Sequence, residues 1–201
     1  MSNGNQRAKQ NKRSNTTTDP LISPVDPEEL ADYLGLEHDP SEDALLNSLL
    51  LTACGWYIAH MNSELLTRDY SLKFDSYPTW GDSYTGLSPV HANLDDWIDI
   101  PLTPVAVVTD VTAEAEAQTF TFDLDSKPAR VFLDNRFVQE IDITYTAGYA
   151  AKSAIPQNTI LGIQMMAAFL YEHRGACDIN DAAKQSGACS VWGYSGMILS
   201  L

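Results

Sequence analysis

The chain has 201 residues, a hydrophobic fraction of 44% and a formal net charge of −15. This length suits one domain with tails, and the apolar fraction is sufficient for a sizeable core. The negative charge argues against a general binder of nucleic acid or of anionic membranes, because neutralising phosphates requires clustered lysine and arginine.

Residues 1–20 are predicted to be a flexible basic tail. Four bases lie in the first fifteen positions, where there is no acid: Arg7, Lys9, Lys12 and Arg13. Residues 2–18 include no large apolar side chain, which is typical of a disordered, solvated segment. The remainder of the chain carries −19, from eight bases and twenty-seven acids. The tail therefore either contacts DNA or an acidic surface, or is solvated.

Two helices are predicted in the first third of the chain, at about 26–35 and 41–62. The first begins with the N-cap Asp26, a proline at the first helical position and the capping-box residue Glu29, and it ends at Gly35. The second helix carries paired apolar residues at intervals of four. Since this repeat drifts by about 40° per step on a 3.6-residue helix, the apolar stripe wraps around the rod. Such a helix needs neighbours on several sides, from its own chain or from another copy.

The segment at about 67–147 is predicted to be an antiparallel β module inserted between helices. Apolar residues alternate along it, most clearly at Ile141, Ile143 and Tyr145, and glycine and proline positions separate the runs. A long loop at 75–93 carries three aromatic residues that form a contact surface or pack over the sheet edge: Tyr77, Trp80 and Tyr84.

A third helix is predicted at about 156–174, and it is apolar almost all the way around, as in the centre of a bundle. The fold class is therefore α+β: a small helical bundle with the β insertion at 67–147 and extended N- and C-terminal tails. Residues 21–176 are expected to form a single domain, and 177–201 a C-terminal docking tail.

No catalytic residue, metal site or cofactor is predicted. The four histidines lie in different predicted elements, without a second ligand at metal-binding spacing: His38, His60, His91 and His173. No phosphate-binding loop or nucleophile motif occurs. The three cysteines, an odd number without metal-type spacing, fit a reducing cytoplasm: Cys54, Cys177 and Cys189.

The acidic residues Asp95, Asp96 and Asp99 suggest either a calcium site or a carboxylate pair, or solvated acids at the end of a strand. We favour the solvated acids, since no EF-hand glycine pattern accompanies them. No signal peptide is expected after Met1, and the apolar run at 160–171 is too short to span a bilayer. No membrane partner is predicted.

Five segments in this order and spacing resemble the head-tail adaptor (connector) proteins of tailed bacteriophages: 39–46, 56–58, 98–105, 143–149 and 155–174. The resemblance covers roughly residues 26–175. It implies a ring of twelve copies beneath the portal protein, with genomic DNA passing through the lumen without sequence-specific binding. It also implies a platform for stopper or tail proteins, a location in the virion neck and synthesis in the host cytoplasm. The family has no catalytic residues to transfer.

Two sets of residues are candidates for assembly contacts under this interpretation. Six C-terminal residues are candidates for portal docking, unless the segment folds back on its own domain: Val191, Trp192, Tyr194, Met197, Ile198 and Leu199. Five helical residues are candidates for packing between subunits, unless they are buried within one chain: Leu51, Trp56, Leu161, Met165 and Phe169.

Three alternatives remain open. The first is a tail-completion or stopper protein of the same neck, which engages the tail side. The second is a surface- or carbohydrate-binding β module that stacks sugars on Tyr77, Trp80 and Tyr84, although the long apolar helices argue against it. The third is a hydrolase with dispersed residues, for which the acids at 95–99 are the only support.

Overall fold

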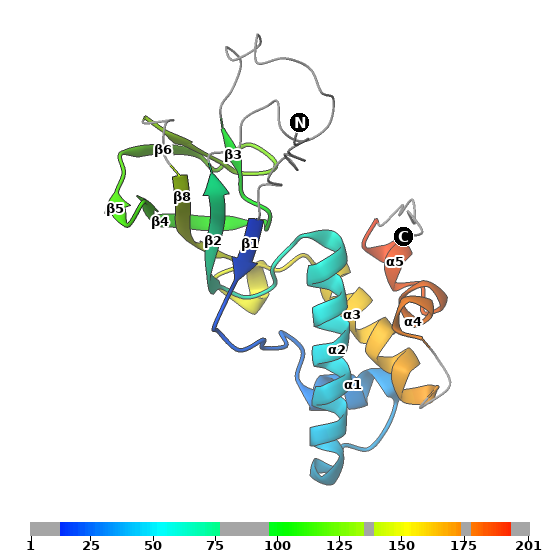
Figure 1. The fold of residues 1–201 in the computed structure, drawn as a ribbon. Coiled ribbons are helices and arrows are strands. Elements are labelled where there is room, and N and C mark those ends of the chain that lie inside the picture. Colours follow the sequence, from blue (N-terminus) through cyan, green and yellow to red (C-terminus); the bar gives the residue numbers. More distant parts are fainter. Residues whose placement is uncertain (1–12, 77–96, 135–138, 174–177, 194–201) are drawn as a thin grey trace, which may run out of the picture. The chain divides into compact units, whose positions relative to one another are not determined.

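The computed structural model describes residues 13–76, 97–134, 139–173 and 178–193, and the chain divides into two compact units (Figure 1). The β unit combines residues 1–18 with Arg68–Ala147, and the helical unit combines Asp19–Thr67 with Gly148–Leu201. The predicted α+β class, with a β module inserted between helices, is confirmed. Residues 21–176, predicted as a single domain, extend over both units.

The helical unit contains the three predicted helices and two short C-terminal ones. Their bounds, with two 3₁₀ turns, are α1 (Pro27–Leu34), η1 (Pro40–Glu42), α2 (Asp43–Met61), η3 (Lys152–Ala154), α3 (Gln157–Glu172), α4 (Ile179–Gln185) and α5 (Ala188–Val191). Helix α2 packs against α3, and α1 contacts both of them. The first three helices begin and end within two residues of the predicted positions.

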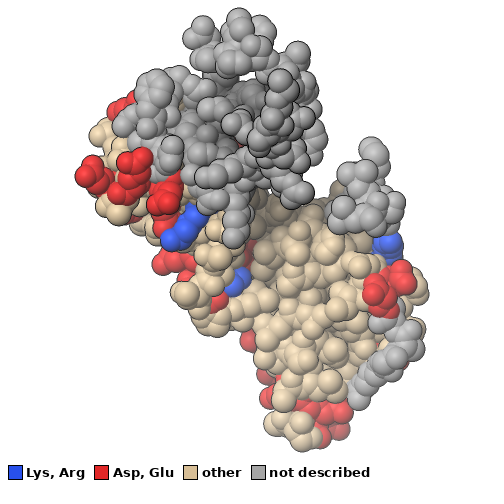
Figure 2. Space-filling model, viewed as in Figure 1, with Lys and Arg blue, Asp and Glu red and all other residues tan. Residues whose placement is uncertain are grey.

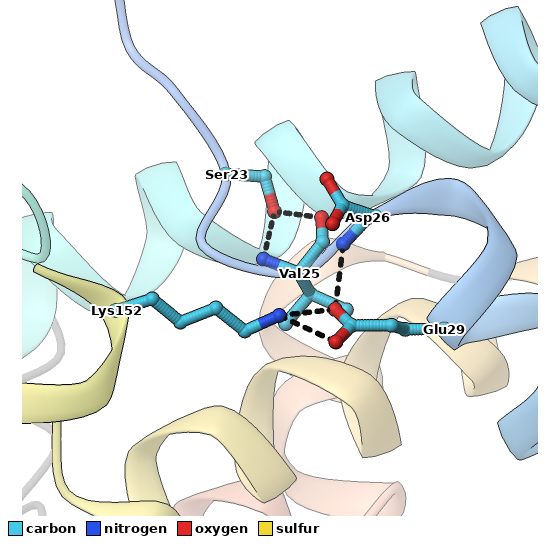
Figure 3. A network of polar contacts seen from close by, with 5 residues as sticks. All are labelled: Ser23, Val25, Asp26, Glu29 and Lys152. Atoms are coloured by element: carbon cyan, nitrogen blue, oxygen red, sulfur yellow. Dashed lines mark hydrogen bonds and ion pairs between the residues drawn. The ribbon is translucent and has the colours of Figure 1, made fainter.

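Helix α1 has the ends that its sequence predicts. The backbone N–H of Asp26 donates to the Glu29 carboxylate at 2.9 Å, which is one half of a capping box. Gly35 adopts φ +69°, and its N–H donates to Asp32 O at 3.0 Å. Lys152, from η3, donates to both carboxylate oxygens of Glu29 and so ties α1 to the start of the C-terminal half (Figure 3).

The core of the helical unit forms where α2 and α3 meet, and it includes Leu46, Leu50, Ile163 and Met166. By length and composition alone, the stretch Pro40–Met61 could cross a membrane. A third of its most apolar window, 33%, is buried within the structure, and the buried residues of α2 pack into this core.

The β unit contains two antiparallel sheets in its described part. The larger has the order β1-β2-β8-β4-β5, with β1 (Arg13–Thr16), β2 (Arg68–Ser76), β8 (Gln139–Ala147), β4 (Val105–Ala113) and β5 (Glu116–Ala117). The smaller has the order β3-β7-β6, with β3 (Ile98–Asp99), β7 (Arg130–Leu133) and β6 (Phe120–Asp123). The predicted alternation places Ile141, Ile143 and Tyr145 on one buried face of β8, because side chains alternate across a strand.

Within residues 1–20, predicted as a flexible basic tail, Arg13–Thr16 form strand β1 against β2. A polar segment can join a sheet because the ladder uses backbone groups that every residue carries. The pairing also has a specific side-chain contact, since Tyr145 Oη donates to Asn15 Oδ1 at 3.1 Å.

Within the segment 177–201, predicted as a C-terminal tail, residues 178–193 contain α4 and α5. Asp178 caps α4 by accepting from the N–H of Asn180 at 2.8 Å. Ala182, Ala183 and Ala188 are fully buried. Small side chains at these positions allow two short helices to lie close to the rest of the unit.

Candidate assembly surface

Helix α2 carries large apolar residues that its own unit covers only in part. Five of them are half-buried: Leu45, Leu49, Leu51, Ile58 and Met61. Between them Ala44, Asn47, Ser48 and Ala59 are exposed, so the outward side of the helix is a mixture of small and partly covered apolar residues. Leu51, predicted as a contact between subunits, lies on this side.

Trp56 does not lie on this surface, because it is buried within the helical unit with 6% of its surface exposed. Its ring stacks on His60 at a centroid distance of 4.0 Å and on Trp192 at 5.5 Å. Its Nε1 donates to Asn180 Oδ1 at 2.9 Å. The sequence could not anticipate this, since both Trp192 and Asn180 come from the far end of the chain.

On α3, the three predicted contact residues have different environments. Leu161 is 41% exposed and available to a neighbour. Met165 is half-buried, and a Cβ at Gly187 would lie 3.0 Å from its Cε, so the chain's own C-terminal segment partly covers it. Phe169 is half-buried and stacks on His173 at 4.0 Å. Leu161 is therefore the most accessible of the three.

The C-terminal helices fold back onto α3 through Trp192, which is 7% exposed. Its indole lies over Gly162, where a Cβ would fall 2.1 Å from Nε1, and this Nε1 donates to Thr159 O at 3.2 Å. Asn158 Nδ2 donates to Val191 O at 3.3 Å and so holds the end of α5. The structure thus places Trp192 in the core of its own unit, not on a free docking surface.

The other four residues predicted to dock on a portal lie outside the described residues: Tyr194, Met197, Ile198 and Leu199. The loop aromatics Tyr77, Trp80 and Tyr84 also lie outside them, as do His91, Asp95, Asp96 and Cys177.

An acidic surface on α1 and the turn before α2 escaped the sequence analysis. Between Asp19 and Asp43 the sequence has nine acidic residues and neither lysine nor arginine. Figure 2 shows acidic side chains gathered at the end of the helical unit that holds α1 and η1. We call Glu28, Asp32, Glu37, Asp39 and Asp43 the acidic face. The run of acids without a base was the signal that could have revealed it.

His38 lies within the acidic face and shows that its carboxylates are close together. Its Nε2 is 2.7 Å from Asp43 Oδ1. This hydrogen bond raises the pKa of His38, and the charges of Asp43, Glu28 and Asp32 raise it further. Glu28 and Asp32, both on α1, therefore act on the imidazole of His38, which lies after the end of that helix.

Two large apolar side chains interrupt the acidic surface. Tyr33 is 45% exposed and Leu36 is 38% exposed. They lie at positions i and i+3, with Asp32 and Glu37 on either side in sequence. The acidic surface therefore includes apolar area beside its carboxylates.

The described residues contain no group of three or more His, Cys, Asp or Glu side chains placed to hold a metal ion. Asp99 instead accepts from Arg130 Nε at 3.1 Å. Burial raises the pKa of the Cys54 thiol to about 12, which makes it a core residue and not a nucleophile.

A hollow of about 200 Å³ opens in the β unit, lined by residues 16–18, Asp69, Tyr70, Ser71 and Thr144. Its one carboxylate, Asp69, accepts from Thr146 Oγ1 at 2.6 Å. It offers hydroxyl groups and a single engaged acid, without a base beside a nucleophile among the lining residues.

No protein-family model and no curated protein matches the chain. Solved structures do resemble it. A chain in the neck of an empty gene transfer agent (GTA) particle, computed with C6 symmetry, has a TM-score of 0.66 and 20% identity over 86% of this chain and 94% of that one. A chain in the neck of the native GTA particle, computed with C12 symmetry, has a TM-score of 0.61 and 21% identity over 86% and 94%. A chain in the virion of the native particle has a TM-score of 0.60 and 21% identity over 85% and 93%. At these identities, what the chain shares with those proteins is the fold.

Proposed function

We propose that this chain is a structural, non-catalytic subunit of the neck of a phage-like particle. In this role it is a head-to-tail adaptor: twelve copies form a ring beneath the portal, extend the DNA channel and receive stopper or tail proteins. The observation that carries the proposal is the fold shared with GTA neck chains, since it extends over 86% of this chain and 94% of the neck chain with the TM-score of 0.66.

The symmetry of those neck structures supports a ring. They were computed with C6 and C12 symmetry, and an adaptor copied twelve times is compatible with both. A closed ring uses two different surfaces of each subunit, one against each neighbour. A subunit of this kind should therefore keep apolar side chains on more than one side.

The partly covered residues of the helical unit meet that requirement. Leu51 on α2 is half-buried and Leu161 on α3 is 41% exposed. Covering the remaining apolar surface of one such leucine contributes about 1 kcal/mol, and the same contact repeats at every interface of a ring.

The charge of the chain suits a subunit that surrounds a moving polyanion. A net charge of −15 discourages DNA from adhering to the body, since phosphates are repelled by carboxylates. The DNA would thus pass through the lumen without sequence-specific contact.

The segment after Gly193 is the candidate for portal docking. Four of its residues are apolar or aromatic: Tyr194, Met197, Ile198 and Leu199. Because Trp192 is held on α3, the segment would leave from a fixed point, which lowers the entropy lost on docking. Removing residues 194–201 while keeping Trp192 tests this role, since the deletion spares the described fold. Unchanged attachment to portal-containing capsids would exclude it.

The ring is tested by measuring the mass of the purified chain alone and with the portal protein of its particle. We expect Leu51→Glu with Leu161→Glu to weaken ring formation at least tenfold, because each change places a charge in an apolar contact. The matched control is Leu51→Met with Leu161→Met, which keeps volume and apolarity. Equal assembly of both double variants would refute the contact surface. Binding to a tail protein and not to the portal would instead favour the stopper role.

A further inference from the structure

We propose that the acidic face on α1 docks the basic N-terminal segment, residues 1–12, of a neighbouring copy. The inference rests on the proposed ring, because it requires copies side by side. It assigns a partner to a helix face that the described part of the chain leaves uncovered.

The acidic face is electrostatically incomplete within the described residues. No ion pair there joins Glu28, Asp32 or Glu37 to a lysine or arginine, whereas Glu29 has Lys152. Glu28 and Asp32 are four residues apart on α1, a spacing at which like charges destabilise a helix.

The helix dipole adds to this cost. Asp32 lies in the last turn of α1, which has no basic residue, and the negative end of the dipole disfavours a carboxylate there. A cation arriving from outside the unit would relieve both effects at once.

Residues 1–12 have the complementary charge. They include Arg7, Lys9 and Lys12 and no acid, and they lead directly into β1. A segment of twelve residues spans at most about 40 Å. An arginine can also stack on an exposed ring, and Tyr33 offers one at 45% exposure.

Docking on a neighbour follows from the charge of the body. Each copy carries −15, so packing copies side by side adds repulsion at every interface. A basic segment that reaches across the interface offsets this repulsion where it arises. We infer the neighbour's segment as the occupant because docking across the interface adds attraction between two copies, whereas docking within one chain adds none.

Charge reversal in full-length chains tests the inference. The segment variant is Arg7→Glu, Lys9→Glu and Lys12→Glu, and the face variant is Glu28→Lys, Asp32→Lys and Glu37→Lys. We expect either variant alone to associate about tenfold more weakly than wild type in 0.1 M salt, by mass photometry with the portal present. The deficit should vanish near 1 M salt, since the Debye length falls from about 10 Å to about 3 Å.

Mixing the two variants distinguishes docking of a neighbour's segment from docking of the chain's own segment. In the segment variant both the segment and the face are acidic, and in the face variant both are basic. In the mixture, each segment therefore finds a face of opposite charge only on a chain of the other variant. Recovered association of the mixture supports exchange between copies. Recovery only when both reversals are in one chain would mean that each segment docks on its own face, which overturns the inference.

The matched control reverses three other exposed acids, by Asp110→Lys, Glu114→Lys and Glu116→Lys. They lie on β4, in the following turn and on β5. It should not weaken association, and a deficit equal to that of the face variant would show a non-specific charge effect and overturn the inference.

If wild type forms no ring at all, the proposed function fails. If the ring forms equally with every variant, only this inference fails. Loss of binding to a short DNA duplex by the segment variant, with unchanged association, would identify the segment as a DNA contact instead.

Discussion

Replacing Gly162 by alanine adds a methyl group where the indole of Trp192 lies. The added Cβ would be 2.1 Å from Nε1 and 2.5 Å from Cε2 of that ring. Since carbon atoms pack at about 3.5–4.0 Å, either the indole or the helix must move by more than about 1 Å. The indole would then lose its stacking on Trp56 at 5.5 Å, its edge-to-face contact with Tyr57 at 5.2 Å and its hydrogen bond to Thr159 O.

The expected cost follows from two limits. Complete displacement of the ring would resemble a Trp→Ala substitution, at about 3–5 kcal/mol. A shift of the helix that keeps the ring in place would resemble overpacking, at about 1–3 kcal/mol. We therefore expect Gly162→Ala to destabilise the helical unit by about 2–4 kcal/mol. In urea unfolding followed by tryptophan fluorescence, its transition should move to lower denaturant.

The control is the same substitution in a Trp192→Ala background. Without the indole the clash disappears, and alanine is favoured over glycine in a helix interior by about 1 kcal/mol. Gly162→Ala should thus destabilise the wild-type chain and stabilise the Trp192→Ala chain. A stabilising effect in both backgrounds would refute the close contact between α5 and α3.

Three further predictions concern titratable groups. Hydrogen bonds from Lys152 and the Asp26 backbone lower the pKa of Glu29, so its stabilisation is present above the ordinary carboxyl pKa and lost as pH falls through the lowered value. Glu29→Gln keeps an acceptor for the capping box but loses the ion pair to Lys152, whose partly exposed partners are screened by solvent, so it should cost about 0.5 kcal/mol at pH 7 by urea unfolding, and the cost should shrink as the pH is lowered. The hydrogen bond to Asp43 raises the pKa of His38 above 6.5. The stabilisation from the protonated imidazole is therefore complete below pH 6.5 and is lost as the pH rises through the raised pKa. In an NMR titration, Asp43→Asn should lower the pKa of His38. Burial raises the pKa of Cys54 to about 12, so its thiol should resist a disulfide reagent at pH 8 until urea unfolds the chain, and rapid native labelling at Cys54 would contradict this.

The helix ends and the strand pattern could be predicted because their causes are local. Asp26, Glu29 and Gly35 cap α1 with groups only a few residues away. The alternation of Ile141, Ile143 and Tyr145 indicates a strand with one buried face in any sheet that accepts it. Such signals depend on bond geometry and on side-chain period, and both can be read along the chain.

The candidate site could be predicted only in part. Leu51 and Leu161 keep accessible apolar surface, and their contact between subunits stays a prediction, whereas Trp56 is enclosed by residues near position 180 and beyond. Nothing in the local sequence distinguishes an indole that faces a sister subunit from one that its own chain will cover.

The sequence alone determined where helices begin, where strands alternate and how charge is distributed along the chain. Only the tertiary structure decided that residues 13–16 join β2, that Trp192 packs over Gly162, and that Glu28 and Asp32 act on His38. The first set depends on neighbours within one turn or one strand. The second depends on which distant segments fit together, and that fit is set by the whole packed core at once.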